Sequence, residues 1–349
     1  MKEIGSIYSV QTLEKRSCPS IDLAGEGAVY FSLCREALLV IARRYRSTAK
    51  KVLIPAYTCQ TVLDPFLQED WEICYYNIDK KLRIDTDDLK SKYSAFNPTL
   101  CIAHPYYGAD LNEKELEGLG ELKRKGCVLV EDLTQCVFSK QYSSIFDFFV
   151  GSYRKWFPIP DGAFMIGCLD DNHEMQENSA FVEPMSDAMY LRGVFHRTGD
   201  NNIKEISRRV GNMAISHISG GIVPHKISNF STSLLNEIDV EGTMKKRRDN
   251  YQYLYEQLSN SSICTPVERS LDELTCAPLF FPVYVQDRTL FQKKLAQQEI
   301  YAPVLWPVHT DSLLINDGIK QMYNELLMLP IDQRYDESDM ERMVAVIKS

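Results

Sequence analysis

Two acidic residues follow an apolar stretch at a point where they could do chemistry. Glu131 and Asp132 come directly after the apolar run 127–130, which reads as a buried strand. A carboxylate at the end of a buried strand is costly unless a cation meets it. A pyridinium nitrogen is such a cation, because it needs an adjacent anion to keep its proton. Alone the signal is weak, since acidic residues also cap the turn that follows a strand.

A lysine further along the chain has an unusual setting. Lys155 lies in the segment 151–156 (GSYRKW), among aromatic and apolar residues and next to Arg154. Desolvation and a neighbouring like charge both lower the pKa of an amine and favour its neutral, nucleophilic form. An isolated lysine in a loop is usually a surface residue, so Lys155 becomes a catalytic candidate only together with Asp132.

The elements that must position these residues alternate in kind. From about residue 25 to 170, short β-rich runs follow amphipathic helical patterns. The predicted helices are 36–45, 61–67, 86–90 and 112–125, and the predicted strands are 51–54, 72–78, 99–104 and 127–130. This alternation predicts βαβ units in a mostly parallel sheet with helices on both faces. Such sheets bind ligands beyond the carboxyl ends of their strands.

Several classes of function are excluded by pattern and composition. A dinucleotide-binding domain needs a glycine-rich turn after a strand, and no GxGxxG is present. With 48 acidic and 39 basic residues, the net charge of -9 argues against a nucleic-acid partner. The most apolar stretch, 37–42, is far shorter than the ~20 residues of a membrane span, so no membrane partner is expected.

The cysteines and the N-terminus indicate a protein of the cytoplasm. No N-terminal segment has the pattern of a secretory signal. The ten cysteines and six histidines show no CxxC pair or metal-ligand spacing. We therefore expect reduced thiols and no metal.

The second half of the chain differs from the first. Residues 170–225 are polar and predicted to be irregular, and apolar residues beyond Ser228 recur at helical spacing. A strand-like run near 279–285, a helix at 289–298, a further piece near 301–305 and a closing helix after Asp336 follow. We expect a large domain over 1–228 and, from 229 to 349, a long connecting helix and a smaller α+β domain.

Taken in order, the motifs resemble the DegT/DnrJ/StrS family of fold type I pyridoxal-phosphate (PLP) enzymes, which are mainly sugar aminotransferases. The resemblance runs over most of the chain and is carried by 34–38 (CREAL), 52–59 (VLIPAYTC), 107–110 (YGAD), 131–135 (EDLTQ), 152–155 (SYRK), 160–162 (PDG), 228–230 (SNF) and 329–332 (LPID). It implies an α/β fold of the type I PLP-transferases, with a mostly parallel mixed sheet flanked by helices. The implied cofactor is PLP.

The resemblance also implies roles for three residues near the reacting atoms. Lys155 would form the Schiff base with PLP and then shuttle a proton, as a positioned amine can. Asp132 would keep the pyridine nitrogen protonated. Gln135 would pack beside the ring oxygen of the cofactor.

The implied phosphate site draws on four further residues. The amides of Cys34 and Arg35, at a helix start, would bind the phosphate, where family members commonly have Gly-Thr or Gly-Ser. Ser152 could add a hydroxyl, although it lies closer to the lysine than the family's serine does. Asn229 would reach the phosphate of the neighbouring subunit, which implies a homodimer with shared active sites.

The stacking and substrate residues are less well defined. Cys59 occupies the position where the family usually has an aromatic residue on the PLP ring, and Tyr57 could substitute if the loop shifts. Arg192 and His196 could meet the phosphates of a nucleotide-linked sugar or belong to a solvated insertion. His309 could face the substrate or be structural.

These observations predict a PLP-dependent aminotransferase that moves an amino group from glutamate to a keto-sugar, nucleotide-linked, for cell-surface polysaccharide or a related glycan. A dehydratase or elimination enzyme of the same fold is one alternative, although dehydrating relatives carry histidine where this chain has Lys155. A degenerate, non-catalytic regulatory protein is the other.

Overall fold

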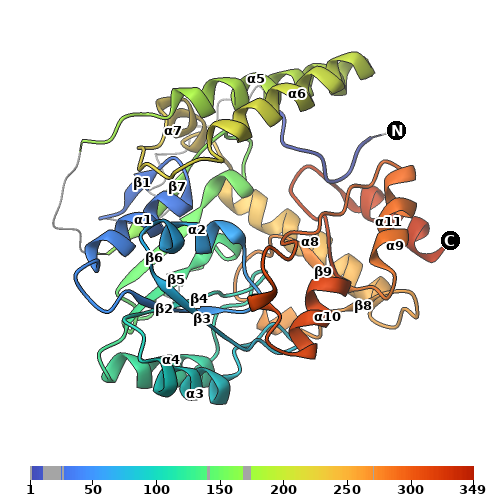
Figure 1. The fold of residues 1–349 in the computed structure, drawn as a ribbon. Coiled ribbons are helices and arrows are strands. Elements are labelled where there is room, and N and C mark those ends of the chain that lie inside the picture. Colours follow the sequence, from blue (N-terminus) through green and yellow to red (C-terminus); the bar gives the residue numbers. More distant parts are fainter. Residues whose placement is uncertain (1, 11–24, 26, 140–141, 168–173, 270) are drawn as a thin grey trace.

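The computed structural model describes residues 2–10, 25, 27–139, 142–167, 174–269 and 271–349. A central sheet is covered by α3 and α4 on one face and by α1 and α2 on the other, and a pair of long helices, α5 and α6, lies above them (Figure 1). The C-terminal elements gather at one side of the molecule.

The central sheet has seven strands in the order β1-β7-β6-β5-β4-β2-β3. Their bounds are Val29–Phe31 (β1), Lys51–Pro55 (β2), Glu72–Tyr76 (β3), Leu100–Ala103 (β4), Val128–Asp132 (β5), Phe148–Ser152 (β6) and Ala163–Ile166 (β7). Strands β2 to β6 run parallel, whereas β7 is antiparallel to both β6 and β1. The mostly parallel mixed sheet is confirmed.

The helices between the strands also appear where the pattern predicts them. They are α1 (Cys34–Arg44), α2 (Gln60–Gln68), α3 (Thr86–Phe96) and α4 (Glu113–Arg124). The start of α4 shows why: Asn112 accepts a hydrogen bond from the amide of Glu115 at 3.0 Å, and the Glu115 carboxylate accepts from the amide of Asn112 at 2.8 Å. Such reciprocal capping satisfies amides that would otherwise lack partners.

The prediction of irregular structure over 170–225 is wrong. Two long helices lie there, α5 (Ser179–Thr198) and α6 (Asn201–His217). Only Ser207 and Ala214 of α6 are buried, and apolar residues of the pair, among them Tyr190 and Met213, are exposed. Helix α6 therefore offers few buried positions to identify it, whereas α5 buries residues such as Phe181 and Met189 but contains Pro184, which usually interrupts a helical pattern.

The long helix expected after Ser228 is two helices, α7 (Asn229–Leu235) and α8 (Val240–Leu258). Asp239 starts α8 anew, because its carboxylate accepts from the amide of Gly242 at 3.0 Å. The break lies at residues 236–239, between the two helices.

The C-terminal region contains a second, antiparallel sheet in the order β10-β9-β8. The bounds are β8 Thr265–Pro266, β9 Phe281–Tyr284, β10 Leu326–Leu329, α9 Arg288–Gln297, α10 Asp317–Glu325 and α11 Glu337–Lys348. Residues 301–305 form no strand. The division at 228 stays a prediction. No helix in the described part of the chain is long and apolar enough to cross a membrane.

Candidate active site

Four parallel strands end at one cleft. Cys59 follows β2, His104 follows β4, Asp132 ends β5, and Lys155 lies in a 3₁₀-helix, η2 (Tyr153–Lys155), that follows β6. All four residues line the cleft. Ligand sites of parallel sheets lie at this edge, as the sequence predicts. Six of the predicted cofactor residues line it: Cys34, Arg35, Cys59, Asp132, Gln135 and Lys155.

Asp132 is buried, and its carboxylate is held from two sides. Its Oδ1 accepts a hydrogen bond from the amide of Thr134 at 2.9 Å, and its Oδ2 lies 3.5 Å from Nδ1 of His104. His104 and Asp132 lie side by side because the residues directly before them, Ala103 and Glu131, pair in the parallel ladder of β4 and β5. The carboxylate is thus fixed at the mouth of the cleft.

His104 is a site residue that the sequence analysis missed. Its Nε2 lies 2.9 Å from Oγ1 of Thr58, so the ring bridges Thr58 and Asp132. Burial lowers the pKa of His104, opposed by the charge of Asp132. A neutral ring that accepts from Thr58 would direct its remaining N–H toward Asp132. Its position at the end of a predicted strand, level with Asp132, was the available signal.

Lys155 is exposed in the cleft, which corrects the expectation of a desolvated amine. The aromatic residues that follow it, Trp156 and Phe157, turn away into the core instead, where they are 0% and 1% exposed. The indole of Trp156 donates to the carbonyl of Thr134 at 2.8 Å. This bond ties the lysine segment to the loop that carries Asp132.

The far end of the lysine segment is pinned as well. Gly162 has φ +136°, and its amide donates to the carbonyl of Ser32 at 2.8 Å while its carbonyl accepts from Tyr153. The adjacent carboxylate of Asp161 accepts from the amide and the hydroxyl of Ser228, at 3.0 and 2.6 Å, and from the hydroxyl of Ser231. The segments 160–162 and 228–230, which carry the resemblance, therefore contact each other directly.

The start of α1 forms one wall of the cleft. An α-helix leaves its first amides without intrahelical partners, so those of Cys34 and Arg35 are available to an anion. Arg35 donates from Nη2 to the carbonyl of Ile218, but its Nε is buried without a partner among the described residues. Burial lowers the pKa of both Arg35 and Arg154, and the charge of Arg35 lowers that of Arg154 further.

Two of the cysteines and a glutamine complete the cleft. Burial, followed by the charge of Asp132, raises the pKa of Cys34, whose Sγ lies 3.8 Å from the Thr134 hydroxyl. Cys59 is half-buried, and its Sγ lies 3.1 Å from the Thr61 hydroxyl. Gln135 accepts from the amide of Tyr107 at 3.2 Å. Trp306, which the sequence analysis did not select, also lines the cleft.

Three predicted cofactor residues do not line the cleft. Tyr57 is buried against Trp306, with ring centroids 4.7 Å apart, so it lies behind the cleft wall. Ser152 is buried in β6 opposite Ala163. Asn229 is exposed at the start of α7, and its amide donates to Glu177 at 3.3 Å.

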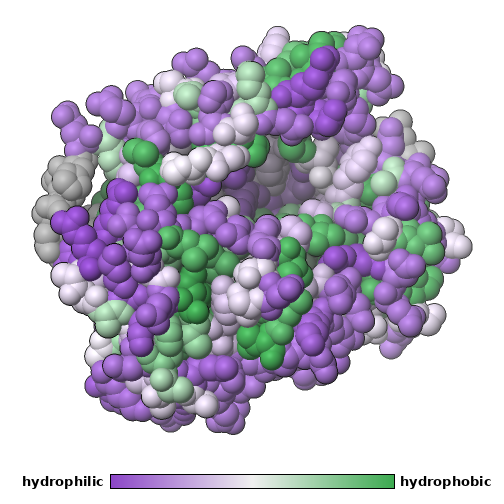
Figure 2. All heavy atoms as spheres, viewed as in Figure 1, coloured by the Kyte–Doolittle hydropathy of each residue, from purple (hydrophilic) through white to green (hydrophobic). Residues whose placement is uncertain are grey.

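A second, larger cavity of about 510 Å³ shares Lys155 with the cleft. Its walls come from the N-terminal segment 5–8, α5, α6 and the C-terminal region, and Figure 2 shows a hollow beneath the α5–α6 pair. Arg192 lines it, as does Arg154. His196 lies nearby but outside, 3.6 Å from Glu3, and His309 is exposed and lines neither space.

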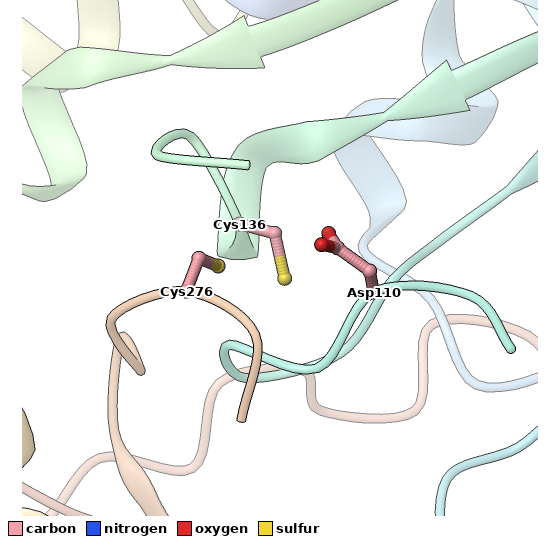
Figure 3. A group of neighbouring side chains, drawn as sticks. All are labelled: Asp110, Cys136 and Cys276. Atoms are coloured by element: carbon pink, nitrogen blue, oxygen red, sulfur yellow. The ribbon is translucent and has the colours of Figure 1, made fainter. Parts of the chain in front are cut away.

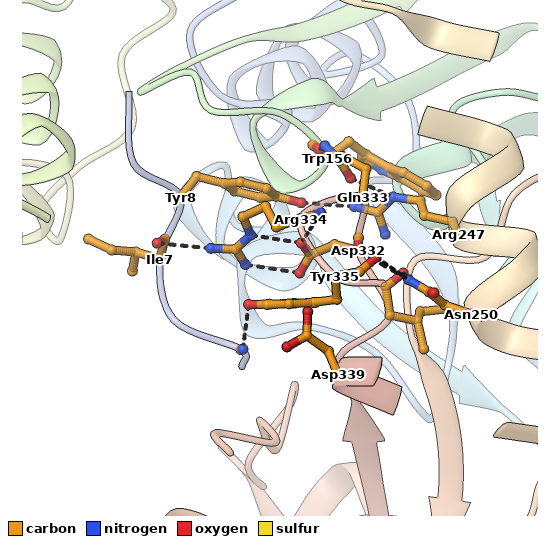
Figure 4. A network of polar contacts seen from close by, with 12 residues as sticks. Ile7, Tyr8, Trp156, Arg247, Asn250, Asp332, Gln333, Arg334, Tyr335 and Asp339 are labelled. Atoms are coloured by element: carbon orange, nitrogen blue, oxygen red, sulfur yellow. Dashed lines mark hydrogen bonds and ion pairs between the residues drawn. The ribbon is translucent and has the colours of Figure 1, made fainter. Parts of the chain in front are cut away.

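One wall of this cavity is formed by a network of charged and polar groups (Figure 4). Arg334 pairs with both oxygens of Asp332, at 2.7 and 2.9 Å, and donates to the carbonyl of Ile7. Arg247 donates to the hydroxyl of Tyr8 at 2.8 Å and lies 4.7 Å over the Trp156 ring. The wall is therefore connected to the lysine segment through Trp156.

Solved structures with the same fold identify the fold of this chain. No family model matches the chain, and no curated protein matches its sequence. The solved sugar aminotransferase CalS13 from Micromonospora echinospora is similar, with a TM-score of 0.66, 19% identity and coverage of 92% of this chain and 86% of that one. A DegT DnrJ EryC1 StrS aminotransferase from Brucella abortus has a TM-score of 0.65 at 14% identity, and the match covers 93% of this chain and 86% of that one.

NtdA from Bacillus subtilis, solved with its cofactor PMP bound, gives a TM-score of 0.65 at 15% identity, over 94% of this chain and 74% of that one. At these identities the likeness concerns the backbone. The predicted type I PLP-transferase fold is thereby confirmed: the chain folds as the DegT/DnrJ/EryC1/StrS aminotransferases do.

Proposed function

We propose that this protein is a PLP-dependent aminotransferase that transfers an amino group from glutamate to a keto-sugar linked to a nucleotide. The observation that carries the proposal is the meeting of Asp132 and Lys155 in one cleft at the carboxyl ends of β5 and β6. A fixed buried carboxylate and a free amine are the two groups that this cofactor requires of a protein.

The residues of the cleft fit PLP on chemical grounds. The phosphate would lie at the start of α1, where the amides of Cys34 and Arg35 and the helix dipole favour an anion. The buried Nε of Arg35, which has no partner among the described residues, is a further donor of the right charge. PMP, found in one of the solved structures of this fold, is the amino form of PLP.

When bound, PLP supplies an aldehyde that takes up the amino group and a ring that accepts electron density. Asp132 would hold the proton on the ring nitrogen, and His104 would keep the Asp132 carboxylate oriented. Lys155 would hold the aldehyde and, once displaced by the amino donor, move the proton at the carbon atom next to nitrogen. Gln135 would lie beside the ring oxygen.

The keto-sugar would occupy the second cavity, which reaches Lys155. A volume of about 510 Å³ is in the range of sites for ligands of drug size. Arg192 lines this cavity, and its Nε is buried without a partner among the described residues, as a donor for phosphate would be. This supports a nucleotide-linked substrate over a free sugar.

We further propose a homodimer with shared active sites. Several apolar side chains are exposed on α5 to α7 and the connection before α7: Tyr190, Ile206, Met213, Ile215, Val223 and Phe230. Ile215 also lines the second cavity, so a partner that covers this surface would lie at the site. Asn229, exposed at the start of α7 and next in sequence to Phe230, would reach the partner's phosphate.

The proposed setting is the cytoplasm, and the proposed use of the aminated sugar is a cell-surface polysaccharide or a related glycan. The resemblance to sugar aminotransferases is what supports this use.

The experiment is a half-reaction. Protein loaded with PLP is incubated with glutamate alone, and we expect PMP to form and 2-oxoglutarate to be released in equal amounts. Lys155→Ala should release none. The control is Lys320→Ala, an exposed lysine that pairs with Asp317 at 3.1 Å, and it should react as the wild type does.

Two results would contradict the proposal in different ways. Bound PLP that no amino donor converts would favour a dehydratase or elimination enzyme. Failure to bind PLP at all would favour a regulatory protein that retains only the fold.

A further inference from the structure

Three side chains from distant parts of the sequence converge outside the cleft. Asp110 follows β4, Cys136 follows the 3₁₀-helix η1 (Leu133–Gln135), and Cys276 precedes β9. Their donor atoms all lie within 4.8 Å of one another. Figure 3 shows both sulfur atoms and the carboxylate pointing into the same space.

The three groups are buried but poorly satisfied. Asp110, Cys136 and Cys276 are 8%, 0% and 1% exposed. Oδ1 of Asp110 has no hydrogen-bond partner among the described residues. The thiols of Cys136 and Cys276 make weak contacts: their sulfur atoms lie 3.5 and 3.7 Å from the carbonyls of Pro105 and Ala277, and they share a hydrogen bond. A buried carboxylate oxygen without a partner is costly, and native structures contain few such atoms.

Backbone hydrogen bonds hold the loops around the cluster in place. The amide of Cys276 donates to the carbonyl of Gly108 at 3.0 Å, and the amide of Asp110 donates to the hydroxyl of Thr275 at 2.9 Å. Gly108 has φ +87°, and a Cβ there would lie 2.7 Å from Cα of Pro278. Two loops are thus locked together at the point where the donors converge.

A second carboxyl group and two cations surround the cluster. Oε2 of Glu131 is also buried without a partner among the described residues. Arg269 donates to the carbonyl of Tyr106, and Arg248 donates to the carbonyl of Leu274 at 2.9 Å, next to the loops that carry Asp110 and Cys276. These guanidinium groups would offset the excess negative charge of two thiolates and a carboxylate around a divalent ion.

We propose that Asp110, Cys136 and Cys276 bind a divalent cation of the zinc class. Two soft thiolates and one carboxylate are donors that zinc accepts in tetrahedral sites. The fourth position would be filled by a water molecule or by Glu131. On binding, the two thiols would release their protons to solvent, and the ion would satisfy Oδ1 of Asp110.

A disulfide between the two cysteines explains less. It would join the sulfur atoms but leave the Asp110 oxygen buried and unpartnered beside an uncharged bond. The sequence predicts no metal, because ligand pairs of zinc sites usually lie close together in sequence. Here the three ligands come from three loops, and only folding brings them together.

The ion would hold two segments of the chain together. Cys136 directly follows Gln135 of the cleft, and Cys276 lies in the connection between β8 and β9 of the C-terminal sheet. The metal would fix the loop that carries Asp132 and Gln135 to that connection. This role does not depend on the proposed transaminase reaction.

The test uses the full chain after removal of metal under reducing conditions. Titration with Co²⁺, a spectroscopic stand-in for Zn²⁺, should give thiolate-to-cobalt charge-transfer bands and strong visible bands of a four-coordinate ion, saturating at one equivalent per chain. Zn²⁺ should remove these bands by competition, whereas Mg²⁺, which prefers oxygen ligands, should not. No PLP is needed for this readout.

Variants assign the ligands. Cys136→Ser, Cys276→Ser and Asp110→Asn should each weaken Co²⁺ binding at least about tenfold. Cys264→Ser, a change at a buried cysteine outside the cluster, should leave binding unchanged. Circular dichroism of each variant would separate misfolding from loss of a ligand.

The wild-type spectrum decides the matter even if a variant misfolds. Absence of thiolate-to-cobalt bands in folded, reduced wild-type protein would overturn the proposal. Bands that persist unchanged in folded Cys136→Ser would overturn it too. Mass spectrometry that finds Cys136 and Cys276 joined in protein purified with no reductant, together with no bands after reduction, would identify a redox pair instead.

Discussion

The cleft and the larger cavity, which meet at Lys155, differ in how their charged side chains are paired. In the cleft, the Asp132 carboxylate accepts from the Thr134 amide and faces His104, and the described part of the chain offers it no ion pair with arginine or lysine. In the larger cavity, three of the five lining arginines have carboxylate partners: Arg334 has Asp332, Arg192 has Glu3, and Arg208 has Glu205.

This difference indicates which charged side chains are available to bind a ligand. A buried carboxylate without a cation is poised for a cationic group such as a protonated ring nitrogen. Arginines with carboxylate partners shape a wall and contribute spare donors, such as Nε of Arg192, to an anion. Matched substitutions in the two spaces should therefore have different consequences.

The largest expected effect is that of Asp132→Asn on the rate. The amide keeps the shape of the side chain but cannot hold a proton on the ring nitrogen, so kcat should fall at least about 10²-fold. The measurement is the steady-state rate with glutamate and a keto acceptor. Asp132→Glu should recover part of the rate, and an Asp132→Asn enzyme as fast as the wild type would contradict the role assigned to Asp132.

The same substitution in the cavity wall, Asp332→Asn, should affect stability more than rate. Burial of Arg334 without its bidentate partner should cost about 3 kcal/mol of the free energy of unfolding. Urea unfolding of the two asparagine variants is the comparison. If Asp332→Asn lowered kcat as strongly as Asp132→Asn and left stability intact, the contrast between the two spaces would be wrong.

A smaller effect is expected for Arg192→Ala on nucleotide binding. Loss of one charged donor should weaken the affinity for uridine diphosphate about tenfold, or ~1.4 kcal/mol. Isothermal titration calorimetry measures it, with Arg209→Ala as the control, because Arg209 is exposed on α6 and outside the cavity. Equal affinities in wild type and Arg192→Ala would remove the argument for a nucleotide-linked substrate.

The smallest effect concerns Glu3, which precedes the N-terminal segment of the cavity wall, and the pH dependence of the free energy of unfolding. Burial opposes ionisation of Glu3, but His196, Lys204 and Arg192 prevail and lower its pKa to about 2. A lowered carboxyl pKa stabilises the folded state above the ordinary value of 4.5 and loses that contribution as the pH falls toward 2. Glu3→Gln should remove about 1 kcal/mol at pH 6 and little at pH 2.

Urea unfolding at several pH values tests this dependence. Glu183→Gln, at an exposed carboxylate of α5, serves as the control and should keep the wild-type profile. A Glu3→Gln protein whose deficit does not shrink as the pH falls would contradict the assignment.

Much of the cleft could be predicted because regular strands position it. Asp132 and Lys155 follow strands whose apolar patterns are visible in the sequence, and parallel strands bring their carboxyl ends to one edge. The resemblance added Cys34 and Gln135, which do line the cleft. The exposure of Lys155 was not predictable, because Trp156 and Phe157 turn inward at a 3₁₀-helix.

Features made by distant segments could not be found in this way. The wall formed by Tyr8, Arg247 and Arg334 joins both ends of the chain, and no local pattern predicts such contacts. Helix α6 escaped detection because it buries only Ser207 and Ala214, and α5 contains Pro184, a residue that usually breaks a helical pattern. The convergence of Asp110, Cys136 and Cys276 likewise depends on loops that only the folded chain brings together.

Borohydride reduction of the PLP-loaded protein, followed by peptide mapping, examines the pairing of Asp132 with Lys155 without any assumption about the substrate. We predict a single reduced phosphopyridoxyl adduct, on the peptide that contains Lys155, and its absence from Lys155→Ala. An adduct on any other lysine, or none in a protein that has bound PLP, would contradict the assignment of the cleft.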